Sequence, residues 1–390
     1  MEMKIAQVCY IYPPAIGGVE THVERISKYL KKRGHDIEVL CSDYISLNRG
    51  TRTKCGRQIV NGIKVTRMRG SYIPGYGQKI AFPALFGVLM NSNFDIIHVH
   101  SFPSLHFDLC WLAAKMKGTP IVATGHFDPN LLDEASERVH KRVYWNLWLR
   151  NALRGCKLIA IINKEKKKYI ENFGIPGKNI TVIPNGVDLE ELRSVSKKDV
   201  ERLISKYKLK GKRVILFVGR ICRSKGIDIL IRAAKPMLEK DKSLVLMVVG
   251  PIDDHAYYKE VEKLAKLPNI VITGGLERRE VLAAFKNSSI VVLPTRGEVF
   301  GITLIEGMMF KKIVIGSKVG GVPDMIDNGK NGYMFKVGDA SELRKRLEYV
   351  LKNYGKLGKL RENAYRKAVS KFSWEKIARE IEGVYKGALR

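Results

Sequence analysis

Short, uninterrupted apolar runs alternate with helix-length segments along the whole chain. Most of the runs lack the apolar–polar alternation of a half-exposed strand, and continuous apolar runs are typical of parallel strands covered on both faces. The pattern therefore predicts an α/β protein with doubly wound sheets. The expected strands are residues 4–12, 36–41, 63–68, 95–100, 120–125, 158–162, 181–184, 214–219, 244–250, 270–273, 290–294 and 312–316.

A dozen strands are too many for one such sheet of ordinary size. A charged helical segment follows "IPNGVD" (183–188) before the next apolar run, so we place the break between domains there. We expect an N-terminal domain over 1–188 and a C-terminal domain over 189–371. In such sheets ligands bind beyond the carboxyl ends of the strands, and two facing sheets predict a cleft between the domains.

The composition is that of a soluble globular protein, with 45% hydrophobic and 28% charged residues among 390. The six cysteines are scattered without a CxxC pair or a zinc-like spacing, so we expect free thiols in a reducing compartment. No apolar run approaches the ~18 residues that span a bilayer, and the first residues do not form a secretory signal. These features favour a cytoplasmic protein.

The net charge of +30 indicates an anionic partner or only a lysine-rich chain. Residues 1–188 hold 27 Lys and Arg against 15 Asp and Glu, and the remainder holds 42 against 24, so both halves are basic. No motif that reads DNA or RNA is present, which argues against a nucleic-acid partner. One stretch, 44–94, has no acidic residue; its basic residues are Arg49, Arg52, Lys54, Arg57, Lys64, Arg67, Arg69 and Lys79. Such a stretch is either a solvated face or a surface for an anionic membrane.

Three turns that follow predicted strands carry candidate site residues. Gly17 and Gly18 in "AIGGVETH" lie at a strand-to-helix turn, where glycine permits close backbone approach and the helix start can face an anion. Arg220 and Lys225 in "VGRICRSKG" suit a diphosphate. His126 in "ATGHFDP" ends a third strand. Each also has an ordinary structural interpretation, because glycine turns, exposed cations and single histidines are common.

The segment "EVFGITLIE" carries two glutamates in apolar surroundings. We expect Glu298 in a loop, a helix beginning at Gly301, and Glu306 on that helix. Free N–H groups at the helix start can bind phosphate, and the carboxylates can accept hydrogen bonds from hydroxyls. The later "GSKVGGVPDMI" places Gly320 and Gly321 after a strand, which suggests backbone approach to a ligand.

These motifs together, in their order along the chain, resemble family 4 of the retaining glycosyltransferases. The order is GGxE near the N-terminus, VGR…KG, ExFGxxxxE, GGVPD and then NGY, and the resemblance covers essentially all 390 residues. The family includes phosphatidylinositol mannosyltransferases, sucrose synthases and relatives of bacterial glycogen synthase. It implies the GT-B fold, in which two Rossmann-like domains face a central cleft. It also implies that the final segment, 372–390, forms a helix that returns to complete the first domain.

The resemblance assigns a role to each motif. Glu298 matches the glutamate on the donor-sugar hydroxyls and Glu306 the one on the ribose, while Arg220 and Lys225 match the diphosphate clamp. His126 matches the histidine near the reacting centre. The implied catalytic residues are His126, Glu298, Arg220 and Lys225. The implied donor-binding residues are Gly17, Gly18, Arg220, Lys225, Glu298, Phe300, Gly301, Ile302, Thr303 and Glu306.

Positions after Glu306 depart from the family's Glu-Ala-Met-Ala-x-Gly-x-Pro. Gly307 replaces the first alanine and Lys311 the helix-ending glycine. A lysine is electrostatically favourable at a helix C-terminus. We therefore expect these changes to alter the packing of the turn rather than the chemistry.

The implied reaction is transfer of a hexosyl group, with retention, from a UDP- or GDP-hexose such as GDP-mannose to an acceptor hydroxyl. No Asp-x-Asp sequence occurs, so we expect neither a metal nor another cofactor. The expected acceptor is lipid-linked or a glycan, in glycolipid, polysaccharide or glycoprotein biosynthesis. Alternatives are a non-hydrolysing nucleotide-sugar epimerase of the same architecture, a glycosidase with the two glutamates as acid and nucleophile, and a basic membrane-binding protein without catalysis.

Residues 141–154, "KRVYWNLWLRNALR", bear on the acceptor. Arg142, Asn146, Arg150 and Arg154 recur at steps of four and form one polar line on a helix. Together with stretch 44–94, they predict a basic and partly apolar surface on the N-terminal domain. Such a surface suits reversible, peripheral binding to the anionic inner face of the cell membrane. A soluble acceptor is the competing interpretation.

Overall fold

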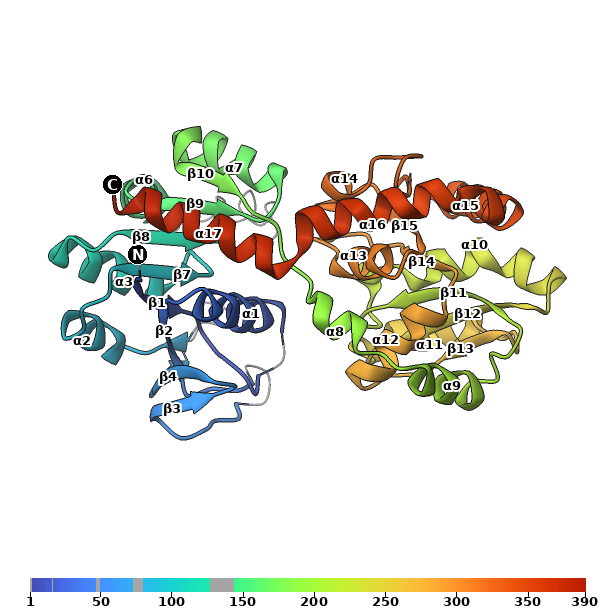
Figure 1. Ribbon diagram of the computed structural model, residues 1–390, viewed down its shortest axis with the longest axis horizontal. Coiled ribbons are helices and arrows are strands. Elements are labelled where there is room, and N and C mark those ends of the chain that lie inside the picture. Colours follow the sequence, from blue (N-terminus) through green and yellow to red (C-terminus); the bar gives the residue numbers. More distant parts are fainter. Residues whose placement is uncertain (1, 16, 47–49, 73–79, 127–143) are drawn as a thin grey trace. The chain divides into compact units, whose positions relative to one another are not determined.

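The computed structural model describes residues 2–15, 17–46, 50–72, 80–126 and 144–390 (Figure 1). The chain forms two compact units, here called unit 1 (Met1–Asn185 with Trp374–Arg390) and unit 2 (Gly186–Ser373). The divisions lie at 185/186 and 373/374, where the sequence suggests 188/189 and 371/372. Within the described residues, no helix combines the length and the apolar character that crossing a bilayer requires.

Unit 1 contains an eight-stranded sheet in the order β10-β9-β8-β7-β1-β2-β4-β3. All neighbouring strands are parallel except β3, which runs antiparallel to β4 at the edge. A separate antiparallel pair joins β5 to β6. The bounds are β1 Lys4–Val8, β2 Asp36–Ser42, β3 Gly56–Val60, β4 Ile63–Met68, β5 Ser71–Tyr72, β6 Ile80–Ala81, β7 Ile96–His100, β8 Ile121–Thr124, β9 Lys157–Ala160 and β10 Ile180–Val182.

Helices cover both faces of the unit 1 sheet, which explains the continuous apolar runs. Ile5 of β1 joins a buried cluster with Ile26 of α1 and Ile381 of the C-terminal helix α17. The next residue, Ala6, joins a second cluster with Phe107 of α3. Successive strand residues thus face opposite layers, as the pleat requires. The helices of unit 1 are α1 Gly18–Lys32, α2 Ala84–Met90, α3 Leu105–Lys117, the π-helix η2 Tyr144–Leu149, α6 Arg150–Arg154, α7 Asn163–Phe173, the 3₁₀ turn η3 Gly177–Asn179 and α17 Trp374–Ala388.

Unit 2 contains a six-stranded, fully parallel sheet in the order β13-β12-β11-β14-β15-β16 (Figure 1). Its strands are β11 Arg213–Val218, β12 Leu244–Val249, β13 Ile270–Ile272, β14 Ile290–Leu293, β15 Ile313–Ser317 and β16 Tyr333–Phe335. Its helices are α8 Leu189–Arg193, α9 Lys197–Lys206, η4 Arg223–Lys225, α10 Ile227–Lys240, α11 His255–Leu264, α12 Arg278–Asn287, α13 Ile302–Met309, α14 Val322–Met325, α15 Ala340–Asn353, η5 Tyr354–Leu357 and α16 Gly358–Phe372.

Each sheet has one point where the order of the strands reverses. In unit 1 the chain builds outward from β1 through β2 on one side and from β7 on the other. In unit 2 the corresponding neighbours are β11 and β14. At such a switch point the loops after the two strands diverge to opposite faces, and a crevice opens at the carboxyl ends. Three of the motifs selected from the sequence follow these strands, since Gly17 comes after β1, Arg220 after β11 and Glu298 after β14. His126 follows β8 and Gly320 follows β15, each one strand further along its sheet.

The prediction of two doubly wound parallel sheets is confirmed, and each expected strand overlaps an observed one. The run 4–12 is shorter than expected, since β1 ends at Val8. Strands β3, β5, β6 and β16 were missing from the sequence prediction. β3 is an edge strand with mostly exposed side chains, and the other three have only two or three residues, so none forms a continuous apolar run.

Candidate functional site

The loops after β11 and β14 meet at the switch point of unit 2 and bring together Lys225 and Glu298. Lys225 ends the turn η4, and Glu298 lies in the loop after β14, as predicted. The Nζ of Lys225 lies 2.7 Å from Oε2 of Glu298, and both side chains are largely buried, at 19% and 14% exposure. The pair joins a cation that can face a phosphate to a carboxylate that can accept hydroxyl hydrogen bonds.

Backbone contacts hold these two loops together. Gly226 has a φ of +67°, and a Cβ there would lie 2.1 Å from the carbonyl oxygen of Pro294, so only glycine fits. The Arg296 amide donates to the Ser224 carbonyl at 2.7 Å. The Arg296 guanidinium also makes two hydrogen bonds to the carboxylate of Asp228, at 2.9 and 2.7 Å. The Lys225–Glu298 pair is therefore positioned by loops that support each other.

Helix α13 begins beside this pair. Gly301 is its N-cap in the left-handed conformation, with a φ of +93°, which confirms the predicted helix start. Thr303 in the first turn donates its hydroxyl to the Val218 carbonyl at the end of β11. Phe300 is buried against Phe372, while Ile302 is 40% exposed. The first turn of the helix thus lies at the carboxyl edge of the sheet, where its N–H groups lack acceptors within the helix.

Gly320 and Gly321 support the Glu298 loop from the other side. A Cβ at Gly320, whose φ is +55°, would lie 1.5 Å from the Glu298 carbonyl oxygen. The Gly321 amide donates to the Val299 carbonyl at 3.1 Å. The sequence suggested that these glycines let the backbone approach a ligand. In the structure their close approach is to the backbone of the loop that carries Glu298.

Glu306 lies on α13, as predicted, and its side chain is buried. It forms an ion pair of 2.5 Å with Arg278, which also contacts Glu191 at 3.1 Å. Burial raises the pKa of Glu306 above its usual value, and the Arg278 guanidinium opposes that rise. Arg278 was not identified from the sequence because it begins α12 in an ordinary charged segment, "LERRE".

Arg220 has a different setting from that of Lys225. Its guanidinium pairs with Asp253 at 2.7 Å, and it is 60% exposed. The backbone of the next residue, Ile221, bridges to Ile252 in the loop after β12. Arg220 thus lies at the same edge of the sheet as Lys225, but its side chain forms an ion pair with the exposed Asp253.

The turn after α13 shows how the chain accommodates Gly307 and Lys311, which depart from the family pattern. Lys311 adopts a φ of +54°, the conformation in which the family has glycine, and pairs with Glu362 at 2.8 Å. A Cβ at Gly307 would approach Val314 Cγ1 to 3.1 Å. Val314 thus occupies room that an alanine side chain at 307 would need. The turn retains a regular helix end, with the Lys312 amide donating to the Gly307 carbonyl at 2.9 Å.

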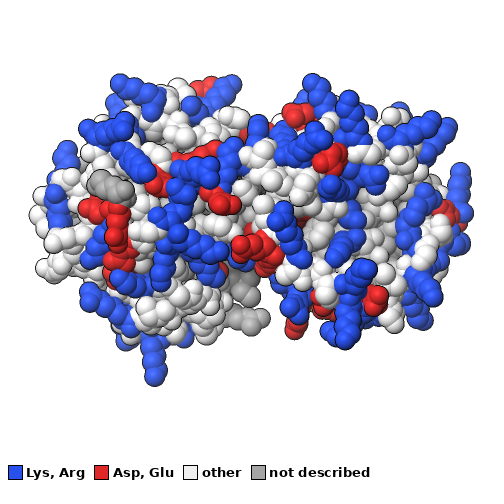
Figure 2. All heavy atoms as spheres, viewed as in Figure 1, with Lys and Arg blue, Asp and Glu red and all other residues white. Residues whose placement is uncertain are grey.

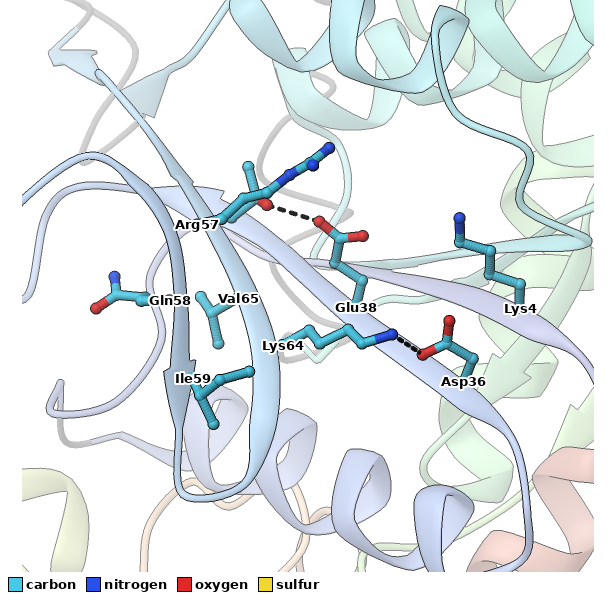
Figure 3. Close-up of a pocket in the computed structure, with 9 residues that line it drawn as sticks. Lys4, Asp36, Glu38, Arg57, Gln58, Ile59, Lys64 and Val65 are labelled. Carbon is cyan, nitrogen blue, oxygen red and sulfur yellow. Dashed lines mark hydrogen bonds and ion pairs between the residues drawn. The ribbon is translucent and has the colours of Figure 1, made fainter.

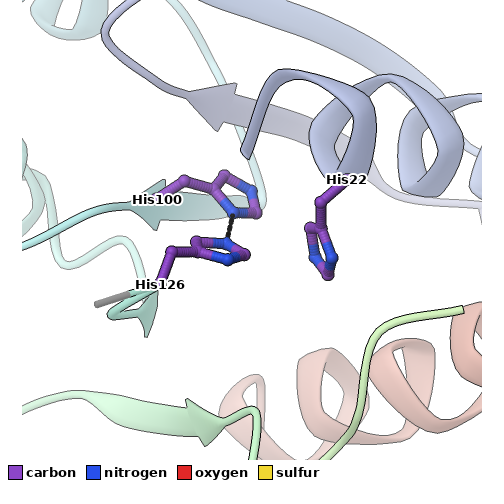
Figure 4. Close-up of side chains that lie close together, drawn as sticks. All are labelled: His22, His100 and His126. Atoms are coloured by element: carbon purple, nitrogen blue, oxygen red, sulfur yellow. Dashed lines mark hydrogen bonds between the residues drawn. The ribbon is translucent and has the colours of Figure 1, made fainter. Parts of the chain in front are cut away.

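The switch point of unit 1 gathers histidines. His126 follows β8, and His100 is the last residue of β7. A hydrogen bond of 3.0 Å joins Nε2 of His126 to Nδ1 of His100. His22 from the first turns of α1 lies against them, with ring centroids 4.6 Å from His126 and 5.6 Å from His100 (Figure 4). The three rings come from three elements around the same strand ends. His126 itself has a left-handed φ of +59°.

A buried network lies behind the histidine cluster. His100 Nε2 contacts Oε1 of Gln7 at 2.7 Å, and the Gln7 amide donates to the Tyr385 hydroxyl of α17 at 2.9 Å. That hydroxyl also lies 2.7 Å from Nδ1 of His98. Burial lowers the pKa of His98, His100 and His126 well below the usual value, and that of His22 to about 4. The cluster is therefore neutral at physiological pH.

Sequence reasoning selected His126 alone. The signal for the others lies in "DIIHVH", where two histidines alternate within an apolar strand and so share one face. His22 lies in the helix "GVETHVERI" four residues after Gly18. Gly17 and Gly18 begin α1, as the turn predicted. A Cβ at Gly17 would lie 2.1 Å from Oε2 of Glu20, so a side chain there would displace that carboxylate.

The acid-free stretch is less cationic in space than in sequence. Arg52 pairs with Asp43 at 3.0 Å and Lys64 with Asp36 at 2.7 Å. Arg67 is buried and hydrogen-bonds backbone carbonyls. Lys54, Arg57 and Arg69 are exposed, and Arg49 and Lys79 lie outside the described residues. On the face in Figure 2, Lys and Arg are spread over both units with Asp and Glu interspersed.

The polar line predicted over 141–154 is only partly described. Arg142 and the side chain of Asn146 lie outside the described residues. The Arg150 Nε donates to the Phe173 carbonyl at 3.0 Å, and the Arg154 Nε to the Gly174 carbonyl at 3.4 Å. These two arginines thus contact the C-terminal end of α7, so part of the predicted basic line has a structural role.

A hollow of about 430 Å³ lies in unit 1 at the opposite end of the strands (Figure 3). Lys4 and Asp36, which line it, are the first residues of β1 and β2. Lys64 pairs with Asp36, and Thr66 donates to Glu38 at 2.6 Å. Because these polar groups satisfy one another and ligands of such sheets bind at the carboxyl ends, we do not assign this hollow a ligand.

Two family models match the chain. "Glycosyl transferases group 1" matches residues 199–367, and "Glycosyltransferase Family 4" matches residues 16–191. Three relatives align along nearly the whole length. An uncharacterized glycosyltransferase of Methanocaldococcus jannaschii is 27% identical over 99% of both chains. The N-acetyl-alpha-D-glucosaminyl L-malate synthase of Bacillus anthracis is 25% identical over 100% of this chain and 98% of its own. The phosphatidyl-myo-inositol mannosyltransferase of Mycobacterium leprae is 25% identical over 98% and 96%.

Solved structures share the fold. A glycosyltransferase from Rickettsia africae superposes with a TM-score of 0.81 at 23% identity, covering 100% of this chain and 99% of its own. Anabaena HepE, solved in complex with UDP, superposes with a TM-score of 0.76 at 20% identity, covering 99% and 100%. The family 4 model ends at 191 and the group 1 model begins at 199, close to the division between the units at 185/186, and the motif order agrees with them. The chain belongs to the group 1 and family 4 glycosyltransferases and has their GT-B fold.

Proposed function

We propose that this glycosyltransferase moves a hexosyl group, with retention of configuration, from a UDP- or GDP-hexose to an acceptor hydroxyl without a metal ion. The observation that supports the proposal best is the Lys225–Glu298 pair beside the Gly301 helix start. It puts a cation, a hydroxyl acceptor and free helix N–H groups at one switch point. These are the three kinds of group that a nucleotide-diphosphate sugar requires.

The leaving nucleoside diphosphate gains negative charge as the glycosidic bond breaks. Lys225 and the first turn of α13 are placed to stabilise that charge. Arg220 can join them if it exchanges Asp253 for phosphate oxygens. Its present pair is solvent-exposed, and exposed pairs contribute only about 0–1 kcal/mol, so the exchange costs little.

The two glutamates hold opposite ends of the donor in this proposal. Glu298 accepts hydrogen bonds from sugar hydroxyls, and Glu306 accepts them from the ribose. An ionised Glu306 accepts hydrogen bonds at both of its oxygens, and the Arg278 guanidinium favours that state against the effect of burial. Neither glutamate acts as a nucleophile.

His126 of unit 1 is assigned to the hydroxyls near the reacting centre. Because burial holds its imidazole neutral, it offers a hydrogen bond rather than a positive charge. We assign no covalent nucleophile. Attack from the face of the leaving phosphate, with a phosphate oxygen taking the proton of the acceptor hydroxyl, accounts for retention.

We further propose a lipid-linked acceptor at an anionic membrane surface. The Mycobacterium leprae relative is a phosphatidyl-myo-inositol mannosyltransferase, whereas the Bacillus anthracis relative is an N-acetyl-alpha-D-glucosaminyl L-malate synthase. Edge strand β3 carries one exposed basic and one exposed apolar side chain on the same face, because Ile59, 68% exposed, follows Arg57 by two residues. Such a surface favours the lipid alternative. The enzyme should sediment with anionic vesicles at low salt, and failure to do so leaves a soluble acceptor.

A donor screen tests the reaction. UDP- and GDP-hexoses are incubated with candidate acceptors, release of the nucleoside diphosphate is measured, and the anomeric configuration of the product is read by NMR. Transfer should be unaffected by a chelator. If no donor yields product but a sugar isomer accumulates, the enzyme is an epimerase; if no nucleotide is released under any condition, the transferase proposal is wrong.

Glu298→Ala tests the assignment within the site. It should abolish sugar transfer while binding of the nucleoside diphosphate, measured by calorimetry, stays within about tenfold, a change of 1.4 kcal/mol. Glu348→Ala, on the exposed side of α15, is the matched control and should change neither. Equal loss of nucleotide binding and of transfer in Glu298→Ala contradicts a role confined to the sugar.

A further inference from the structure

The histidine cluster of unit 1 contains more than the transfer reaction needs. His126 is the only member with a proposed role in transfer. Yet one ring nitrogen from each of His22, His100 and His126 lies within 4.8 Å of the others (Figure 4). We propose that these three histidines form a binding site for a divalent transition-metal ion, with Zn²⁺ the best fit. Imidazole nitrogen is a preferred ligand of Zn²⁺, and three histidines with one open position make a known coordination set.

The spacing of the rings is close to what coordination requires. Zinc–nitrogen bonds are about 2.0–2.1 Å, so two nitrogens of a tetrahedral site lie about 3.3 Å apart. The His100 and His126 nitrogens are already 3.0 Å apart. The widest separation, at most 4.8 Å, must therefore close by about 1.5 Å. Rotation of the His22 ring toward the other two supplies that movement.

The outward hydrogen bonds of two rings fix which nitrogens are free. Nδ1 of His22 lies 2.7 Å from Oδ1 of Asn185, and Nε2 of His100 lies 2.7 Å from Oε1 of Gln7. Because an amide oxygen only accepts, each of these nitrogens carries the proton. The other nitrogen of each ring therefore keeps its lone pair. Metal-binding histidines almost always donate their second N–H to an oxygen in this way.

The remaining proton can be placed by the same argument. Nδ1 of His100 has no proton, so the proton in the 3.0 Å contact belongs to Nε2 of His126. When the metal binds, this proton moves to Nδ1 of His126 and frees Nε2 for coordination. All three rings stay neutral, and no net proton is released. The ion's remaining position is open to water.

Metal binding should inhibit transfer, a consequence that rests on the proposed role of His126. A coordinated His126 cannot contact the donor sugar, and the ion would occupy the space beside it. The chemistry of transfer requires no metal in this proposal, so the ion acts on the enzyme as an inhibitor. Metal binding itself does not depend on the proposed reaction and is measured separately.

The experiment titrates metal-free, full-length protein with Zn²⁺ against a competing chelator, and with Co²⁺ followed by its visible absorption. We expect one ion per chain and the intense bands of tetrahedral Co²⁺. His22→Ala should weaken binding more than about 100-fold, beyond the range of outer-shell changes. His255→Ala is the matched control, because that histidine is exposed in unit 2. Equal affinity of wild type and His22→Ala overturns the proposal.

Two changes at Asn185 test the coordination without removing a ligand. Asn185→Ala takes away the acceptor of the His22 N–H and should weaken Zn²⁺ binding about 10–100-fold. Asn185→Asp replaces it with a carboxylate, which raises the basicity of the ring, and should strengthen binding. Tryptophan fluorescence reports whether unit 1 stays folded, since the ring centroid of Trp374 lies 5.2 Å from that of His22. Identical affinities in the two variants contradict a site built around His22.

A transfer assay separates the metal site from the proposed reaction. Zn²⁺ should slow transfer by the wild type in proportion to the fraction of metal sites that are occupied. The His255→Ala control should be inhibited to the same extent. Metal binding without inhibition keeps the site and removes His126 from the reacting centre. Inhibition at zinc concentrations that leave the site empty overturns the inhibitory role.

Discussion

The two units have similar parallel sheets but different polar groups at the switch point. Unit 2 places ionised side chains there, in the ion pairs Lys225–Glu298 and Arg278–Glu306. Unit 1 places neutral imidazoles there, bonded to one another, to Gln7 and to Tyr385. The sheet therefore fixes where a site lies, and the residues after each strand decide what it can bind.

The difference matches the two kinds of group in a glycosyl transfer. A diphosphate carries charge that must be balanced by cations and helix N–H groups, which unit 2 supplies. Sugar and acceptor hydroxyls are neutral, and a neutral imidazole can accept from or donate to them without bringing in charge. Variants that remove charge from unit 2 and add it to unit 1 test this contrast.

Removing the cation that accompanies Glu306 should have the largest effect. In Arg278→Gln the buried carboxylate of Glu306 loses its partner. Breaking a buried pair costs about 3–5 kcal/mol, and because the Arg278 side chain is itself 43% exposed, we expect the lower end of that range. The loss should shrink as pH falls, because protonation removes the uncompensated charge. All four tryptophans lie in unit 1, so fluorescence follows unit 1 and far-UV circular dichroism follows both units during urea unfolding. If Arg278→Gln lowers the free energy of unfolding by less than about 1 kcal/mol at neutral pH, Arg278 does not stabilise the Glu306 carboxylate.

Lys225→Met should give the next largest effect, and the transfer rate is the quantity that reports it. Loss of one group that stabilises the leaving charge should reduce the transfer rate about 10²–10³-fold, or 2.7–4 kcal/mol. Lys225→Arg should restore part of the rate, since it returns the charge. Lys206→Met is the matched control, because Lys206 pairs with Glu280 on the surface of the same unit. If steady-state kinetics give Lys225→Met a transfer rate within threefold of the control, Lys225 does not stabilise the charge of the leaving group.

The sequence predicts the sheets well because their strands are continuous apolar runs, and it predicts the Glu298 loop because Gly301 breaks the pattern before a helix. It does not predict the side-chain partners. Nothing near Glu306 in sequence points to Arg278, since "LERRE" resembles any solvated helix start. His22 and His126 lie 104 residues apart in sequence. They meet because β1, β7 and β8 lie side by side in the sheet, which the order of strands decides.

Strand β3 shows the other limit of sequence reasoning. Its side chains are mostly exposed, and at the sheet edge it needs no apolar face toward a second layer of helices. The stretch 44–94 looked uniformly basic because its partners, Asp36 and Asp43, lie outside it in sequence. Charge balance is thus a property of the folded unit rather than of a segment.

Unit 1 also contains a buried carboxyl, which gives a pH test of the contrast. Burial raises the pKa of Glu165 to about 7, while hydrogen bonds from Tyr169 and from the Ile161 and Ile162 amides oppose the rise. The folded state binds this proton more tightly than the unfolded state, so its stabilising effect is present below the usual pKa of 4.5 and lost as pH rises through 7. The rise in pKa from 4.5 to about 7 corresponds to roughly 3 kcal/mol of folding free energy.

Glu165→Gln should remove that pH dependence from unit 1. The amide keeps an acceptor for the Ile161 N–H and a donor toward Tyr169 without ionising. Wild type should lose stability between pH 5 and pH 8 relative to the variant, as measured by urea unfolding with tryptophan fluorescence. Parallel curves for the two proteins would show that Glu165 does not carry a raised pKa.

The smallest effect is expected at an exposed pair in unit 2, Arg213 with Asp241 at 2.7 Å. The pKa of Asp241 is lowered to about 2, first by the hydroxyl and amide of Ser243 and only then by Arg213. Arg213→Gln should therefore cost less than about 1 kcal/mol, and less still in high salt, because solvent and ions screen surface charges. Far-UV circular dichroism during urea unfolding, at two salt concentrations, measures the change. A loss comparable to that of Arg278→Gln would mean that unit 2 depends on its total charge, whereas a small loss assigns the effect to buried pairs at the strand ends.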